Sequence, residues 1–71
     1  MKVNIEAVSQ LIKDKFRNNK AFFADTIGVN RAYLSSVLNK SAIDDSPKIC
    51  NEIIKYCKEN NLNYENYIFF N

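Results

Sequence analysis

The side chains best suited to chemistry in this chain are hydrogen-bond donors gathered in one short stretch. They are Arg31, Ser35, Ser36 and Asn39, with Lys40 directly after them. An arginine fork can bind a base edge or a phosphate, hydroxyl and amide groups can do either, and lysine binds phosphate as a point charge. Such a set can bind nucleic acid, and it equally suits an ordinary solvent-facing surface, so the residues before it must decide between the two.

Groups that could carry catalysis or hold a metal are scarce. The chain has no histidine and only two cysteines, Cys50 and Cys57. Seven residues of helix separate two backbones by roughly 10 Å, too far for a disulfide, and two isolated thiols do not make a zinc site. The sequence contains no phosphate-cradling glycine loop and no carboxylate pair suited to a cleft. We expect no enzymatic activity, no cofactor and no metal, with both cysteines in the core.

Charge is distributed unevenly along the 71 residues. Residues 1–40 contain seven Lys or Arg and three Asp or Glu, net +4, whereas residues 41–71 contain three and five, net −2. The basic half includes the donor-rich stretch, which suits a surface that faces phosphate. The length predicts one domain, residues 1–71, near the lower size limit for folding alone. No apolar run approaches the roughly 20 residues of a membrane span and no signal peptide is evident, so we expect a cytoplasmic protein with no membrane partner.

Apolar residues recur every three or four positions through most of the chain, which predicts an all-α fold. Helices are expected from a cap at Asn4 onward, over residues 20–27, over residues 30–39, from Pro47 onward and over residues 64–69. Asparagine pairs at 18–19 and 60–61 are expected to end the first and the fourth of these helices.

Residues 20–39 have a more specific spacing. Ala24, small enough for a close helix crossing, lies four residues before Gly28, the only glycine in the chain. Glycine enters a left-handed turn without steric cost, and Asn30 can then cap the next helix. Leu34 and Val37 follow Gly28 at six and nine residues. This is the spacing of a DNA-binding helix-turn-helix, whose second helix enters the major groove.

The pattern resembles the phage repressor and Cro type of helix-turn-helix, also called the xenobiotic-response-element type. The resemblance covers roughly residues 4–69 and is specific only within the helix-turn-helix. It implies a five-helix bundle that binds double-stranded operator DNA, usually as a two-fold dimer.

The helix over residues 30–39 is the expected recognition helix. On a helical wheel of about 100° per residue, one side is apolar and the other holds only polar or small groups. We expect four residues of the polar side to contact bases: Arg31, Ala32, Ser35 and Ser36. Arg31 is the first choice because it lies in the first turn and its fork can bind O6 and N7 of guanine. An ordinary amphipathic surface helix, with Arg31 bound to phosphate or to Asp25, explains the wheel equally well.

Contacts to the DNA backbone are expected along the rim of this surface. The resemblance implies them for Asn30, Asn39 and Lys40, and for Lys20, which stands where the family most often has a phosphate-bound glutamine. Tyr33 lies between the two faces of the wheel, from which its hydroxyl can reach phosphate. Each lysine can equally be a solvated charge.

Two features fit this interpretation poorly. Asp44 and Asp45 follow the recognition helix and would repel phosphate unless they cap the next helix, which is the interpretation we prefer. Phe22 points away from the apolar side of its own helix. It either packs under the first helix or is exposed for a partner.

Aromatic residues crowd the end of the chain. A short helix cannot bury all of them on one face, and exposed apolar patches mark interfaces. We expect a homodimer interface at Tyr64, Tyr67, Phe69 and Phe70. The alternative is that Leu62, Tyr67 and Ile68 close the core while the remainder frays.

These observations predict a dimeric, sequence-specific transcriptional repressor of a phage or mobile element that binds a near-palindromic operator. The alternative is a helix-turn-helix scaffold that binds a protein partner, such as an antirepressor, an antitoxin or a phage-encoded inhibitor. The modest net charge of +2, Phe22 and the aromatic tail support that alternative.

Overall fold

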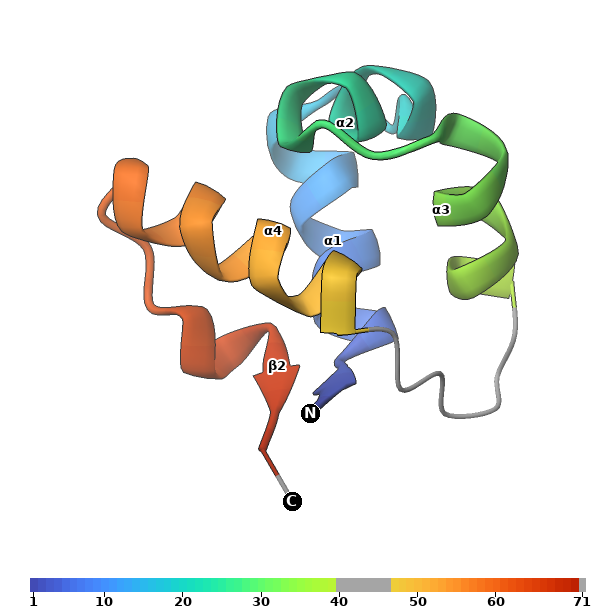
Figure 1. Ribbon diagram of the computed structural model, residues 1–71. Coiled ribbons are helices and arrows are strands. Elements are labelled where there is room, and N and C mark those ends of the chain that lie inside the picture. The colour runs from blue at the N-terminus through green and yellow to red at the C-terminus, as the bar shows by residue number, and fades with distance from the viewer. Residues whose placement is uncertain (40–46, 71) are drawn as a thin grey trace.

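Four α-helices make up most of the structure, a computed structural model that describes residues 1–39 and 47–70 (Figure 1). Helix α1 spans Ile5–Lys15, α2 spans Lys20–Ile27, α3 spans Arg31–Asn39 and α4 spans Pro47–Glu59. A single turn of 3₁₀-helix, η1, spans Tyr64–Asn66, and two short strands, β1 (Lys2–Val3) and β2 (Ile68–Phe69), pair with each other. The first four of the five predicted helices are confirmed, and the protein is mostly helical with a small sheet.

Asparagine side chains begin the first three helices. The Oδ1 atoms of Asn4, Asn19 and Asn30 each accept the N–H of the third residue of α1, α2 and α3, at 3.2, 3.1 and 3.0 Å. Each bond satisfies one of the amides that a helix start leaves without an intrahelical partner. The caps predicted at Asn4 and Asn30 are therefore confirmed, and Asn19 caps α2 in the same way.

Left-handed residues end three of the helices. Gly28 follows α2 with φ 76°, and Asn18 and Asn61 follow α1 and α4 with φ 59° and 57°. Glycine and asparagine adopt this conformation most readily, so the predicted breaks lie where local chemistry favours them. Arg17, with φ 52°, is also left-handed, which its residue type does not predict.

One hydrophobic cluster joins all four helices and both strands. The spacing of apolar residues predicted most of its members, and both cysteines are buried, as expected. Edge-on ring contacts at 5.0–6.0 Å link Phe23 to Phe16 and to Tyr56 at its centre. The buried members are Val3, Val8, Leu11, Ile12, Phe16, Phe23, Ala24, Ile27, Val29, Leu34, Val37, Leu38, Ile49, Cys50, Ile53, Cys57 and Ile68.

The end of the chain differs from the sequence prediction. The α-helix expected over residues 64–69 was wrong: η1 makes one turn and β2 then pairs antiparallel with β1, in the register Lys2 with Phe69 and Val3 with Ile68. The N–H of Asn4 also donates to the carbonyl of Tyr67 at 2.9 Å. Ile68 is buried and Phe69 exposed, an alternation that suits a strand over the core.

Candidate nucleic-acid interface

A tight turn at residues 28–30 joins α2 to α3. The N–H of Val29 donates to the carbonyl of Ala24 at 3.0 Å, and the side chains of both residues are buried. Because Gly28 is left-handed and Asn30 caps α3, the chain ends one helix and begins the next within three residues. Helix α3 consequently lies at the edge of the molecule, packed against α2 (Figure 1).

One face of α3 is buried and the other is open to solvent. Leu34, Val37 and Leu38 belong to the core, which confirms the amphipathic pattern. Four residues expected at the interface are exposed, and Ser35 is half-buried beside them, with its Oγ 3.4 Å from the Nδ2 of Asn39. The exposed four are Arg31, Ala32, Ser36 and Asn39. The small side chains among them leave room for a groove to approach the helix closely.

Arg31 forms a two-bond ion pair with Asp25 of α2. Its Nε donates to Oδ1 at 3.0 Å and its Nη2 donates to Oδ2 at 2.6 Å. The hydrogen bonds from Arg31 and its positive charge lower the pKa of Asp25, and Asp25 in turn raises the pKa of Arg31. Both groups are therefore charged at neutral pH. Sequence reasoning had named Asp25 only as an alternative partner, and the spacing of six residues does not reveal which guanidinium edge it binds.

The residues expected to contact the DNA backbone are exposed wherever the structure describes them. Lys20 is exposed at the start of α2, and Asn30 and Tyr33 are exposed at the start of α3. The Oδ1 of Asn30 caps α3, so a phosphate contact from this side chain falls to its Nδ2 group. Lys40, Asp44 and Asp45 lie outside the described residues.

Phe22 is partly packed against the end of the first helix and partly exposed, so both alternatives given for it hold in part. The residue is 53% exposed, yet its ring meets that of Phe16 edge-on at 5.2 Å between centroids. One side of the ring therefore extends the core and the other faces solvent on α2.

The tail residues divide into two pairs. Tyr64 and Tyr67 pack partly against the core, whereas Phe69 and Phe70 are 54% and 49% exposed. The ring of Phe70 meets Tyr64 edge-on at 5.8 Å. Tyr67 lines a groove of about 250 Å³ along α1. Leu62, Tyr67 and Ile68 lie in or against the core, as the alternative for the tail expected, and Phe69 pairs with Lys2 in the small sheet.

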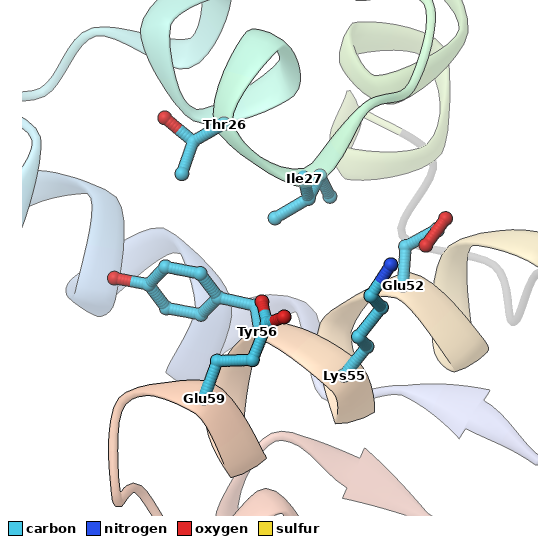
Figure 2. A pocket seen from close by; sticks show the side chains of 6 residues that line it. All are labelled: Thr26, Ile27, Glu52, Lys55, Tyr56 and Glu59. Carbon is cyan, nitrogen blue, oxygen red and sulfur yellow. The ribbon is translucent and has the colours of Figure 1, made fainter.

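A small cavity lies between α2 and α4. Thr26 and Ile27 face Tyr56, Lys55 and the two glutamates of α4, Glu52 and Glu59 (Figure 2). Its volume is about 70 Å³, well below the roughly 300–1,000 Å³ of ligand pockets. In residues 1–39 and 47–70, no three Cys, Asp or Glu side chains are grouped so that they could hold a metal ion.

The chain matches no protein-family model, and no similar protein was found among curated proteins or solved structures. No helix in the described part of the chain has both the length and the apolar character needed to span a membrane.

Proposed function

We propose that this protein is a sequence-specific DNA-binding transcriptional regulator, acting as a small phage or mobile-element repressor. Residues 20–39 form a helix-turn-helix of the phage repressor and Cro type, with α3 as the recognition helix. Two copies bind a near-palindromic operator. The protein uses no cofactor and no metal, and it performs no catalysis.

The observation that carries the proposal is the pairing of a tight α2–α3 turn with a polar, small-residue face on α3. Gly28 and Asn30 fix the turn, and the buried Leu34 and Val37 attach α3 to the core by one side only. The opposite side is free to enter a major groove about 12 Å wide. Arg31 lies in the first turn of α3, the part of a recognition helix that meets base edges.

Selection of bound duplexes from a random library tests this function. At about 100 mM salt we expect a near-palindrome with half-sites one helical turn apart. Arg31→Ala should lose about 1–3 kcal/mol of binding free energy and relax specificity at one position. Lys13→Ala, which removes an exposed charge from α1, is the matched control and should leave the selected sequence unchanged.

Two results would count against this assignment. Equal losses by Arg31→Ala on selected and random duplexes would make Arg31 a phosphate contact. No enrichment over the input library would exclude sequence-specific binding altogether.

The second candidate is a helix-turn-helix scaffold that binds a protein partner, such as an antirepressor, an antitoxin or a phage-encoded inhibitor. The observation that favours it is the exposure of three phenylalanines, Phe22, Phe69 and Phe70, on a chain of net charge +2. Duplex binding that weakens steeply with salt supports the DNA function, because it reports the release of counterions from phosphates. Absence of duplex binding at low salt supports the scaffold.

A further inference from the structure

The Arg31–Asp25 ion pair joins the two helices on either side of the turn. Asp25 lies near the end of α2 and Arg31 is the first residue of α3. The side chains are 65% and 53% exposed, for arginine and aspartate respectively. An ion pair so open to water is screened and adds little to stability, so fold stability is a weak reason for its two-bond geometry.

The atoms used in the pair determine which atoms remain. A guanidinium carries one N–H on Nε and two each on Nη1 and Nη2. Asp25 takes the Nε–H and one Nη2–H. The edge formed by Nη1 and the second Nη2–H therefore keeps two parallel donors, the arrangement that binds O6 and N7 of guanine together.

We propose that Asp25 is a positioning residue for base recognition: it holds Arg31 by its Nε/Nη2 edge and presents the Nη1/Nη2 edge to a guanine in the major groove. This inference rests on the proposed DNA-binding function. A free arginine side chain samples many rotamers, and fixing it before binding lowers the entropy lost when the base contact forms. Specificity at this base pair is then set by two residues from two helices, Asp25 and Arg31, rather than by Arg31 alone.

The carboxylate has a second, opposing effect that makes the proposal testable. A negative charge beside the interface repels phosphates whatever the base sequence. Removing it should therefore leave binding to random DNA unchanged or tighter. If Asp25 positions Arg31, the same change must weaken discrimination at the base pair that Arg31 reads.

The experiment compares wild type, Asp25→Asn, Arg31→Ala and the double variant. Dissociation constants are measured on the selected duplex, on that duplex with the Arg31-dependent base pair replaced, and on a random duplex. We expect Asp25→Asn to reduce discrimination at that base pair about 3- to 10-fold, part of the roughly 5- to 150-fold supplied by a bidentate arginine–guanine pair. The double variant should discriminate at that base pair as well as Arg31→Ala does, because Asp25 has no arginine left to position. Asp14→Asn, which removes an exposed carboxylate of α1, should change nothing at that base pair.

The outcomes separate this inference from the function beneath it. If wild type selects an operator but Asp25→Asn discriminates as well as wild type, or gains equally on all three duplexes, the inference is overturned and the function stands. If wild type binds all duplexes equally, both fail. Matching thermal midpoints of wild type and Asp25→Asn show that any lost discrimination does not come from unfolding.

Discussion

Gly28 is the residue on which the α2–α3 turn depends. Its φ of 76° and ψ of 32° place it in the left-handed region. A Cβ added there would meet no atom within 4 Å. The stability lost on replacing Gly28 should therefore come from backbone conformation and not from crowding by neighbouring atoms. It should vary with how well each residue tolerates the left-handed conformation.

We expect Gly28→Ala to lower the free energy of unfolding by about 1–2 kcal/mol. Gly28→Asn should lose clearly less, because asparagine visits the left-handed region more readily than alanine does. Urea unfolding of the three proteins measures the difference. Equal losses for alanine and asparagine would contradict a purely conformational role.

Cys57 links stability to alkaline pH. Burial raises the pKa of its thiol. The thiol of the unfolded chain ionises near pH ~8.5. Above this pH, ionisation lowers the free energy of the unfolded chain while the folded chain still holds a neutral thiol. The stabilising contribution is therefore complete below about pH 8.5 and is lost as the pH rises through the higher pKa of the folded state.

The reduced protein should accordingly lose stability between about pH 8.5 and 9.5, and Cys57→Ala should lose less over the same interval. Burial also raises the pKa of Tyr56, whose ordinary value near 10 lies above this interval. Urea titrations at several pH values, with a reductant present, compare the two proteins. A decrease in Cys57→Ala as steep as that in wild type would show that another group is responsible.

At the residue scale, sequence predicted what local chemistry determines. The caps at Asn4 and Asn30 and the left-handed Gly28 were foreseeable, because each depends on the chemistry of the residue at that position. The left-handed Arg17 was not, because arginine has no preference for that conformation. The edge by which Asp25 binds Arg31 was not foreseeable either, since it depends on how two helices are oriented.

At the element scale, α2 begins in an unusual way. Its first turn contains no acidic residue, and Lys20 places a positive charge at the positive end of the helix dipole. The exposed lysine therefore does not stabilise the helix that carries it. A phosphate bound at this position would reverse that unfavourable interaction, which agrees with the proposed backbone contact.

Lys20→Gln should leave stability unchanged or raise it by about 0.3–1 kcal/mol, because the charge opposed to the dipole is removed. Binding to selected and random duplexes should weaken alike, and the salt dependence should decrease by about one counterion. Thermal unfolding and titrations at several salt concentrations measure these effects, with Lys13→Ala as the control on α1. A change confined to the selected duplex would place Lys20 at a base instead.

Elements also differ in how far sequence predicts them. Helices α1 to α4 follow from caps and apolar spacing within 8–13 residues. Strand β2 depends on pairing with β1, more than 60 residues earlier, and two-residue strands carry no periodicity to detect. The tail was therefore assigned to a helix because its pairing partner is distant in sequence.

At the scale of the whole molecule, size limits how one chain can read DNA. The longest principal extent of the Cα trace is 29 Å. Successive major-groove faces of a duplex are about 34 Å apart, so a near-palindromic operator needs one copy for each half-site. The exposed Phe69 and Phe70, on the strand and end of the chain, are the surface we propose for joining the two copies.

Sedimentation tests this dimer with a pair of matched variants. Phe69 and Phe22 are 54% and 53% exposed, on the tail and on α2 respectively. At tens of micromolar protein we expect a dimer for wild type and Phe22→Ser and a monomer for Phe69→Ser, because removing a ring weakens association only where the ring is at the interface. Phe69→Ser should also require more protein than wild type to occupy a full operator. It should require the same amount as wild type to occupy a single half-site. A wild-type mass equal to the monomer, or a dimer lost only in Phe22→Ser, would exclude the tail as the interface.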